Sequence, residues 1–277
     1  SRRLVFDPLV SRHDTLVEDW GLHAPRSLQA RWNLGIDRWS LGLADLVLCD
    51  TWAHGALYER LGVPRARLAR VPVGAEARFF DVPPAAGEGV LRIAYVGGFL
   101  PLHGTLTIVE ALARLERQGG LPEYRCEMVG RGIEFDAARA LAHRLGLARV
   151  DFSGPVEYAA APMVLARADI VLGAFGAGGK AGRVIPHKVW QGLAAGRAVV
   201  TGDGDGLREL FEPGRDLWAV PRGDPAALAD GLARLLGDRA LRAALSERGR
   251  ARAREVGTPE RVGATLRAVL EAPGTVA

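Results

Sequence analysis

Short apolar runs alternate with amphipathic stretches through the middle of the chain. Residues 91–96 form an apolar run of strand length, whereas apolar residues recur every three to four positions over 105–117, which predicts a helix. We predict further strands over 124–129, 149–152, 170–172, 198–201 and 217–220. Further helices are predicted over 135–145, 159–168, 186–195 and 207–211. This alternation predicts a Rossmann-like, doubly wound α/β fold, in which helices cover both faces of a parallel sheet.

The first eighty residues follow the same alternation with fewer strands. We predict strands over 4–6, 46–49 and 68–73, and helices over 27–43 and 53–61. Three strands are few for an independent sheet of this class, and the sequence opens Ser-Arg-Arg directly before a strand. Residues 1–80 are therefore expected to be an incomplete second Rossmann-like domain, with sequence missing upstream.

Three further segments complete the expected organisation. Paired prolines at 83 and 84 predict a linker over 81–90. Residues 91–256 form the main domain, and 257–277 are expected to be a C-terminal helix that packs back towards the first domain. The region from 225 to about 272 is helical in pattern, with breaks at Gly237 and Gly257.

Composition and charge exclude some classes of protein. The 277 residues are 48% hydrophobic and 25% charged, with a formal net charge of +4. No apolar run reaches the roughly 20 residues of a membrane span. The sequence also lacks the dense block of basic residues with interleaved aromatic residues that is typical of nucleic-acid binding, so no nucleic acid is expected as a partner. Cys49 and Cys126 each lie in an apolar run, which predicts buried free thiols and a reducing, cytoplasmic compartment.

Glycines follow the predicted strands of the main domain. They lie at Gly97-Gly98, at Gly130 and Gly132 around Arg131, at Gly154 before Pro155 and Val156, and repeatedly over 173–182 and 202–206. Parallel strands end at one edge of a sheet, where open α/β sheets bind ligands. The loops therefore predict a nucleotide-type cleft, although βα turns also favour glycine for steric reasons.

The segment 182–196 carries the most specific local signal. Pro186 begins a predicted helix and Gly196 ends it, so free backbone N–H groups would face an anion at its start. Only two of the 36 basic residues are lysines, Lys180 and Lys188. Lys188 and Gln191 share a helix face, which suits a diphosphate at the first and a sugar diol at the second. The alternative is a solvated lysine on an ordinary surface helix.

A second signal follows the first strand of the main domain. His103 and Gly104 open a helix shortly after the Gly97-Gly98 pair, and the imidazole could donate to a phosphate oxygen or simply cap the helix. Other motifs are incomplete: 173–181 lacks the first glycine and the Ser/Thr of a Walker loop, and no G-x-G-x-x-G follows a strand. Asp203 and Asp205 fit turn chemistry better than a metal site, so no metal is expected.

Four segments, in this order, resemble the C-terminal domain of GT-B-fold retaining glycosyltransferases of family 4, the glycosyl transferases group 1. The matching segments are ADLVLCDT from residue 44, AYVGGFLPLHGTLTIVEALARL from residue 94, VGRG with VDFSGPVEYAAAPMVLARADIVL, and VIPHKVWQGLAAG from residue 184. The resemblance extends from about residue 44 to the end. It implies a nucleotide-sugar donor domain over 91–256 beside a partial acceptor-side domain.

The resemblance also assigns roles to individual residues. Donor diphosphate would contact Gly98, His103, Gly104, Arg183 and Lys188. Gln191 would bind the ribose, and the base would lie against Gly130, Arg131, Gly132, Pro155 and Val156. Asp7 and His13 are the candidate catalytic or acceptor residues. The family commonly has Arg and Lys where Gly98 and His103 stand, and two glutamates where Arg183 and Gln191 stand, so the cations are redistributed.

The implied reaction moves a sugar from a nucleoside-diphosphate sugar to an acceptor hydroxyl with retention, without a metal or another cofactor. The acceptor is an unknown glycan, lipid or small molecule, and peripheral contact with the inner face of a membrane is left open. Two alternatives remain. One is a nucleotide-sugar epimerase, for which the 173–206 loops offer no acid–base carboxylate pair. The other is a non-catalytic nucleotide-binding subunit.

Overall fold

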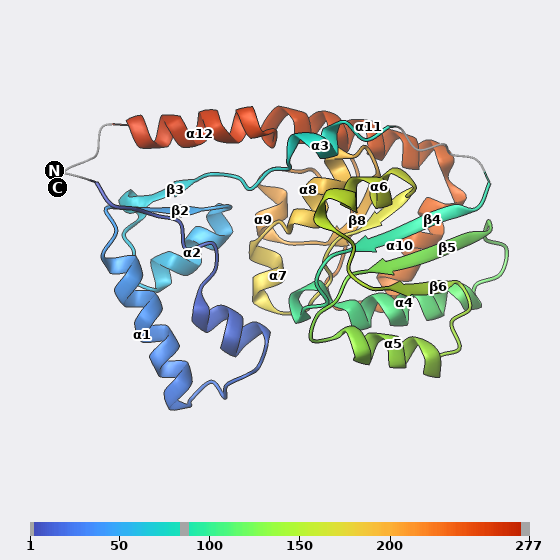
Figure 1. Cartoon of the computed structure of the whole chain (residues 1–277), viewed down its shortest axis with the longest axis horizontal. Coiled ribbons are helices and arrows are strands. Elements are labelled where there is room, and N and C mark those ends of the chain that lie inside the picture. The colour runs from blue at the N-terminus through green and yellow to red at the C-terminus, as the bar shows by residue number, and fades with distance from the viewer. Residues whose placement is uncertain (1–2, 84–88, 273–277) are drawn as a thin grey trace.

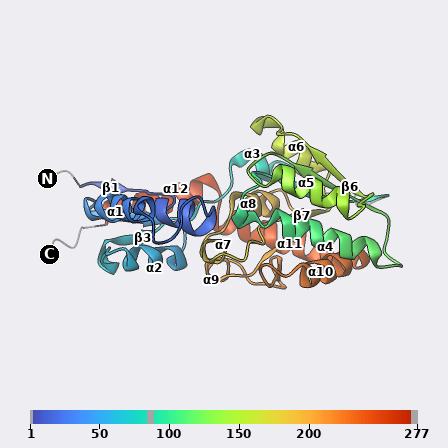
Figure 2. The same cartoon turned by 90° about the horizontal axis from the view of Figure 1, so that it is seen from below.

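Two parallel sheets of unequal size organise the molecule. The computed structural model describes residues 3–83 and 89–272. Figures 1 and 2 show the smaller sheet and its helices at one end and the larger sheet with its helical layers at the other. This arrangement confirms the predicted α/β class with Rossmann-like parallel sheets.

The larger sheet has the strand order β6-β5-β4-β7-β8-β9, and all its neighbouring strands are parallel. Its strands are β4 (Leu91–Val96), β5 (Tyr124–Val129), β6 (Val150–Ser153), β7 (Ile170–Leu172), β8 (Ala198–Gly202) and β9 (Trp218–Val220). Buried apolar side chains line both faces, as expected for a sheet between two helical layers.

Helices cover both faces of this sheet. One layer contains α4 (Thr105–Arg117), α5 (Phe135–Arg144) and α10 (Pro225–Gly237), which share a core with one face. The other contains α3 (Ala77–Phe80), α6 (Ala161–Ala166), α8 (His187–Ala194) and part of α11 (Arg239–Val256). Short helices α7 (Gly179–Arg183) and α9 (Asp205–Arg208) follow β7 and β8.

The smaller sheet has the order β1-β2-β3 and is also parallel. Its elements are β1 (Val5–Phe6), the π-helix η1 (Asp14–Asp19), α1 (Leu28–Gly42), β2 (Leu46–Cys49), α2 (Trp52–Arg60) and β3 (Leu68–Arg70). Side chains of Ser27 and Thr51 accept hydrogen bonds from backbone N–H groups in the first turns of α1 and α2. These caps explain where the two helices begin.

The C-terminal helix α12 (Pro259–Glu271) lies along the smaller sheet rather than the larger one (Figure 1). Its side chains Val262 and Leu266 line a cavity with residues that follow β1, β2 and β3. The N–H of Ala75 also donates to the carbonyl oxygen of Gly257, just before this helix. The end of the chain therefore bridges the two halves.

The sequence predictions place β2, β4, α4, β5 and β7 correctly to the residue, and the bounds of the other predicted strands and helices differ by one to three residues. Residues 14–19, for which no element was predicted, form a π-helix, and residues 179–183, within the region predicted to be a glycine-rich loop, form a helical turn. The short helix predicted over 207–211 forms at Asp205–Arg208 instead. The linker expected over 81–90 includes 84–88, which lie outside the described residues, and so do 273–277 of the expected final segment.

Candidate functional site

The strand order gives the larger sheet a switch point at the carboxyl ends of β4 and β7. These two strands are neighbours, and the chain continues outward from them in opposite directions, which defines a topological switch point. The loops that follow them touch, because the N–H of Phe175 donates to the carbonyl of His103 at 2.9 Å, and Gly176 donates to Leu102 at 3.1 Å. Both strongest sequence signals therefore meet at one edge.

Close packing of loop upon loop explains many of the glycines at this edge. A Cβ on Gly130, whose φ is +133°, would lie 1.9 Å from the carbonyl oxygen of Gly97. A Cβ on Gly104, whose φ is +63°, would lie 2.6 Å from the backbone of Phe175. Such distances admit no side chain, so these glycines are required by the packing itself, without any ligand.

Lys188 lies at the centre of this edge, and its amino group contacts an aromatic ring but no hydrogen-bond acceptor. Its side chain leaves the first turn of α8, is 5% exposed, and places Nζ 3.9 Å from the centre of the Tyr95 ring. Nζ would lie 3.1 Å from a Cβ on Gly97, and it has no hydrogen-bond partner in the structure. Burial holds the pKa of Lys188 well below its usual value. The amino group of Lys188 therefore lacks a hydrogen-bond acceptor beside the glycine loops.

His103 is buried beside Lys188, but it carries no positive charge. Its Nδ1 contacts the carbonyl oxygen of Gly98 and lies 3.1 Å from the hydroxyl of Tyr95. Because a carbonyl only accepts, Nδ1 carries the proton and Nε2 is left as an acceptor. Burial, and then the charge of Lys188, lower the pKa of His103 to about 3. The role of His103 at a donor diphosphate stays a prediction, and the lowered pKa indicates that the imidazole would take part as a neutral group.

Arg183 faces away from Lys188 and towards the N-terminal segment. Its guanidinium forms an ion pair with the buried carboxylate of Asp14 in η1, and its carbonyl oxygen accepts from the hydroxyl of Thr51. Lys180, on the same short helix, donates to Thr15 at 2.7 Å. The structure therefore brings His103 and Lys188 together but engages Arg183 elsewhere, because folding supplies it with a carboxylate partner.

Gln191 lies one turn beyond Lys188 on α8. Its Nε2 donates to the hydroxyl of Tyr158 at 3.1 Å, and Tyr158 in turn donates to Glu76. Tyr158 follows the loop of Pro155 and Val156, both of which are exposed. Gln191 is therefore placed between Lys188 and the loop after β6.

The loop after β5 contains a buried glycine, Gly130, and two exposed residues, Arg131 and Gly132. Gly132 packs tightly on the backbone of Phe99, and the carbonyl of Arg131 accepts from Phe99 at 3.1 Å. The Arg131 guanidinium lies outside, 5.1 Å from the centre of the Phe135 ring. Of the residues predicted to hold a base, Arg131, Pro155 and Val156 are accessible, while Gly130 and Gly132 shape the loop.

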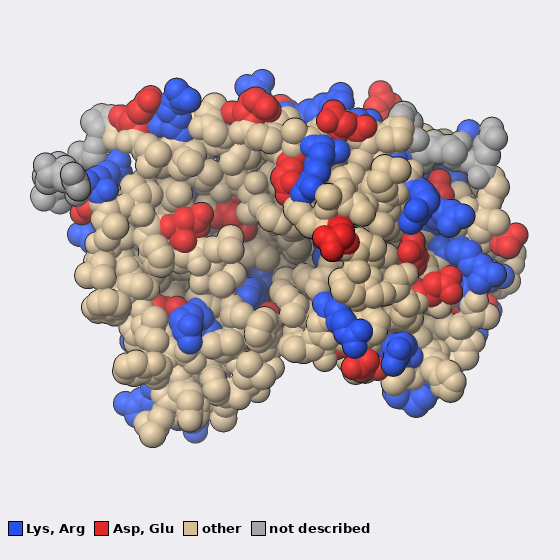
Figure 3. Space-filling view, viewed as in Figure 1, with Lys and Arg blue, Asp and Glu red and all other residues tan. Residues whose placement is uncertain are grey.

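The two predicted acceptor-side residues occupy different cavities. Asp7 lines one with Asp50 and His54 at the carboxyl edge of the smaller sheet, whereas His13 lines another with Asp14 and Arg183. Figure 3 shows the surface hollowed between the two halves of the molecule. The structure does not bring Asp7 and His13 together as one catalytic pair.

Sequence reasoning missed Glu209, which joins the two halves. Its carboxylate accepts from the N–H groups of Trp52 and Ala53, both at 2.7 Å, and from Arg70 at 2.9 Å. A carboxylate at a helix start is stabilised by the unpaired N–H groups there. This cap could not be predicted from the sequence, because the carboxylate belongs to a residue that lies 157 positions from Trp52.

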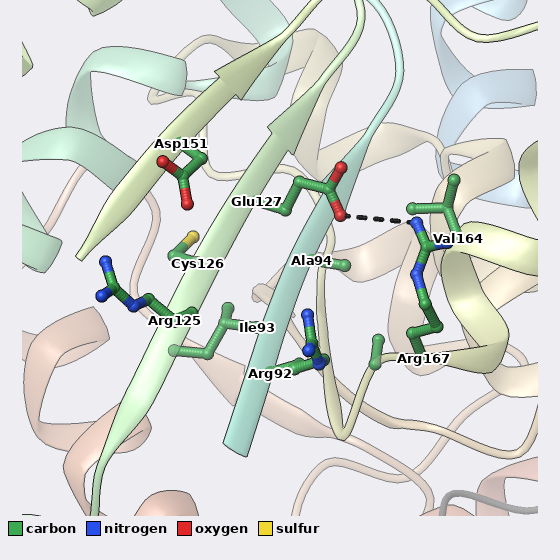
Figure 4. Close-up of a pocket in the computed structure, with 10 residues that line it drawn as sticks. Arg92, Ile93, Ala94, Arg125, Cys126, Glu127, Asp151, Val164 and Arg167 are labelled. Carbon is green, nitrogen blue, oxygen red and sulfur yellow. Dashed lines mark ion pairs between the residues drawn. The ribbon is translucent and has the colours of Figure 1, made fainter. Parts of the chain in front are cut away.

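A further cavity opens on the amino-terminal half of β4, β5 and β6 (Figure 4). Arg92, Arg125 and Asp151 project from these strands, and Arg167 after α6 lies 3.8 Å from Glu127. Three arginines and two carboxylates line it, so most of the charge is compensated within the cavity. This cavity lies away from the glycine loops, and no sequence signal pointed to it.

Metal-binding clusters and membrane-spanning helices are both missing from residues 3–83 and 89–272. No cluster of three His, Cys, Asp or Glu side chains there is arranged to hold a metal ion. Within the same ranges, no helix combines the length and the apolar character that crossing a bilayer requires.

Two parallel α/β units of this kind, one with its switch point between β4 and β7, are the arrangement of the GT-B architecture. The family model described as "Glycosyl transferases group 1" matches residues 79–252, which is more than half of the chain. The chain therefore belongs to the glycosyl transferases group 1 family.

Relatives of known name share the same region. WcaL of Escherichia coli K12, named as a colanic acid biosynthesis glycosyltransferase, is 31% identical over 192 residues, which are 68% of this chain and 46% of WcaL. The phosphatidyl-myo-inositol mannosyltransferase of Mycobacterium tuberculosis is 31% identical over 173 residues, 61% of this chain and 43% of that protein. The chain thus spans less than half the length of these relatives.

Solved structures agree on the fold. HepE of Anabaena, solved with UDP and glucose, superposes with a TM-score of 0.76 at 19% identity, covering 98% of this chain and 72% of HepE. Sucrose-phosphate synthase of Thermosynechococcus elongatus gives a TM-score of 0.72 at 22% identity, covering 90% and 65% of the two chains. At these identities the likeness shows the fold alone.

Proposed function

We propose that this chain transfers a sugar from a nucleoside-diphosphate sugar to an acceptor hydroxyl. The observation that carries the proposal is Lys188, a buried ammonium without a protein acceptor at the start of α8. An unpaired buried charge is costly, and an anion placed beside it would remove the cost. The family match and the UDP in the HepE complex support a nucleotide diphosphate as that anion.

The residues around Lys188 would then bind the rest of the donor. The diphosphate would lie against Gly98, Gly104 and the first turn of α8, with Lys188 offsetting the charge that develops on the leaving group. Gln191 would bind the ribose, and the base would lie between Arg131 and the loop of Pro155 and Val156. His103 contributes a neutral imidazole to this site, and Arg183 orders the neighbouring loop through Asp14.

Chemically, the bond from the anomeric carbon to the diphosphate oxygen breaks and a bond to the acceptor oxygen forms. The proton of the acceptor hydroxyl passes to the departing phosphate, which attack on the same face of the sugar would permit. We therefore propose retention of configuration. Lys188 and the N–H groups of α8 would stabilise the leaving group, and we propose that no metal is needed.

We place the reaction in the cytoplasm, where the free, buried thiols of Cys49 and Cys126 would remain reduced. Peripheral contact with an inner membrane face is also proposed. Exposed Trp32 and Trp39 on α1, with exposed Arg31 and Arg38 beside them, support it. The acceptor would then be a glycan, lipid or small molecule reached at that surface.

The test substitution removes the amino group of Lys188 and keeps an unbranched side chain of similar length. Lys188→Met should stabilise the empty protein by about 1–3 kcal/mol, because it removes a buried unpaired ammonium. It should also abolish the thermal stabilisation that UDP, GDP or ADP gives the original chain. Differential scanning calorimetry with and without each nucleotide measures both effects.

The exposed Arg114→Met on α4 is the matched control and should leave the nucleotide effect intact. Unchanged nucleotide stabilisation in Lys188→Met would refute the donor site. Incubation with UDP- and GDP-sugars then separates the remaining functions. Nucleotide binding with neither transfer nor donor hydrolysis would indicate a binding subunit, and interconversion of the donor sugar would indicate an epimerase.

A further inference from the structure

Three side chains from separate parts of the sequence meet beside the proposed donor site. Gln191 lies on α8, Tyr158 begins the 3-10 turn η4 (Tyr158–Ala160) after β6, and Glu76 immediately precedes α3. Nε2 of Gln191 donates to the hydroxyl of Tyr158 at 3.1 Å, and that hydroxyl donates to Oε1 of Glu76. The three groups therefore form a hydrogen-bonded chain that ends at Gln191.

The order of donors in this chain decides which way the Gln191 amide points. An ionised carboxylate can only accept, so the single proton of the Tyr158 hydroxyl goes to Glu76. The hydroxyl oxygen is then left to accept, and only the NH2 half of the amide can donate to it. Nε2 of Gln191 therefore faces Tyr158, and Oε1 points away from it. Among residues 3–83 and 89–272, no donor bonds to this Oε1.

Tyr158 is held in place by contacts of its ring, although the side chain is half exposed. The guanidinium of Arg78 lies 4.3 Å from the centre of the ring, and the ring centre of Phe79 lies 6.4 Å from it. Arg78 also forms an ion pair with Glu76 at 2.6 Å, so Tyr158 and its acceptor are fixed together. Burial, and then the contact with Glu76, raise the pKa of Tyr158, so the hydroxyl keeps the proton that it donates.

A glutamine depends on such an arrangement when its ligand is a diol. Both oxygens of a carboxylate accept from hydroxyls, whereas a glutamine amide has one accepting oxygen and one donating nitrogen. An amide that is free to turn over would present its oxygen to the ligand in only part of its orientations. The amide of Gln191 is held by Tyr158, so its oxygen stays available as an acceptor.

We propose that Tyr158 and Glu76 are positioning residues of the donor site, which fix the amide of Gln191 so that Oε1 accepts from a ribose hydroxyl. The proposal rests on the donor site proposed above, because it takes a ribonucleotide as the ligand. It makes the site selective for ribose over a sugar that lacks both hydroxyls. It also makes that selectivity depend on Glu76, which belongs to the segment that crosses from β3 to α3.

Calorimetric titration of the 277-residue chain tests this with UDP, GDP and ADP and with the 2′,3′-dideoxy form of each. We expect the unsubstituted chain to bind the preferred ribonucleotide about tenfold tighter than its dideoxy form, as one hydrogen bond predicts. Tyr158→Phe removes the hydroxyl and keeps the ring, and it should lower this ratio to about threefold. Glu76→Ala should lower the ratio as well, because the Tyr158 proton can then be donated to Oε1 of Gln191.

Rescue separates positioning from a general structural role. Adding Gln191→Glu to Tyr158→Phe should restore the ratio of about tenfold, because both carboxylate oxygens accept whichever way the group turns. Any effect of the new charge on the phosphates cancels in the ratio, since both ligands carry the same phosphates. Glu157→Ala changes an exposed glutamate next to Tyr158, and as the control for Glu76→Ala it should leave the ratio unchanged.

An unchanged ratio in either Tyr158→Phe or Glu76→Ala, or a lowered ratio that Gln191→Glu does not restore, would overturn the positioning role. Glu76→Ala gives an answer by itself where Tyr158→Phe fails to fold. The same titrations keep the two proposals apart. Failure of all three ribonucleotides to bind would overturn both, whereas equal affinity for a ribonucleotide and its dideoxy form would overturn this one alone.

Discussion

At the residue scale, burial lowers the pKa of the two side chains that meet at the switch point. Lys188 and His103 both contact Tyr95, and the positive charge of the first disfavours protonation of the second. Water is excluded from both, so the charged forms lose solvation that no protein group replaces. A negatively charged ligand would raise both pKa values again, so proton uptake should accompany its binding.

A pH prediction follows from His103, whose pKa falls to about 3 from an ordinary 6.5. As the pH falls through about 6.5, His103 becomes protonated in the unfolded chain but stays neutral in the folded chain. The free energy of unfolding should therefore fall as the pH drops from about 6.5 towards 4, by up to about 1.4 kcal/mol per pH unit. His103→Gln should remove this part of the slope, which urea unfolding across that range measures.

The control for this prediction is His143→Gln, which changes an exposed histidine on α5. If His103→Gln and the unsubstituted chain show the same slope between pH 4 and 6, His103 is protonated in the folded state. That outcome would restore it as a cation of the site.

At the element scale, α1 buries polar groups and exposes apolar ones. Asn33 and Asp37 are buried, and the carboxylate of Asp37 accepts from Ser11 and from the backbone of 12–13. Trp32 and Trp39 are 70% and 68% exposed on the other side. Helical spacing gathers them with Leu28 and Leu43 into one stripe.

We expect this stripe to bind anionic membranes, because tryptophan and arginine side chains favour the lipid interface. The 277-residue chain should float with vesicles that contain phosphatidylglycerol and not with phosphatidylcholine vesicles. Replacing Trp32 and Trp39 by serine should reduce the bound fraction by about tenfold. Flotation assays measure this.

The exposed Leu145→Ser, on the far half of the molecule, is the control for that change. Equal flotation of the double variant would rule out α1 as the contact. Concentration-dependent self-association that disappears with the two tryptophans would instead assign the stripe to a second copy of the chain.

At the scale of the whole molecule, the two halves differ in how much they bury. Eight of the large apolar side chains that are exposed lie within the first 43 residues: Leu4, Leu9, Val10, Leu22, Leu28, Trp32, Trp39 and Leu43. The hydrophobic core of the smaller sheet contains seven buried residues. The core between the larger sheet and the helical layer of α4, α5 and α10 contains 27. Local opening should therefore cost less free energy in β1–β3 than in β4, β5, β7 and β8.

Hydrogen exchange followed by mass spectrometry measures this difference. Amides of β1, β2 and β3 should exchange at least about tenfold faster than those of β4, β5 and β7 under native conditions. Equal protection in both sheets would mean that the two halves open as one cooperative unit. The contacts of Glu209 with Trp52 and Ala53 and of Lys180 with Thr15 would then be the physical link.

Periodicity alone located most of the fold. The spacing of apolar residues determines whether a segment forms a helix or a strand, so β4, α4, β5 and β7 could be predicted from it. Because strands alternate with helices along the chain, the sheet is expected to be parallel. The family resemblance, which the family match confirms, also rests on sequence alone. Lys188 was singled out because lysine is rare in this chain and because Pro186 precedes a helix.

Charges and partners were decided only by the tertiary structure. The sequence could not show that Arg183 meets Asp14, 169 positions away, or that burial leaves His103 neutral beside Lys188. Spacing of four residues makes a contact between Asp50 and His54 foreseeable, but not the cavity that they line with α12. A side chain's ionisation and partners depend on the solvent excluded around it, which is a property of three-dimensional packing rather than of sequence order.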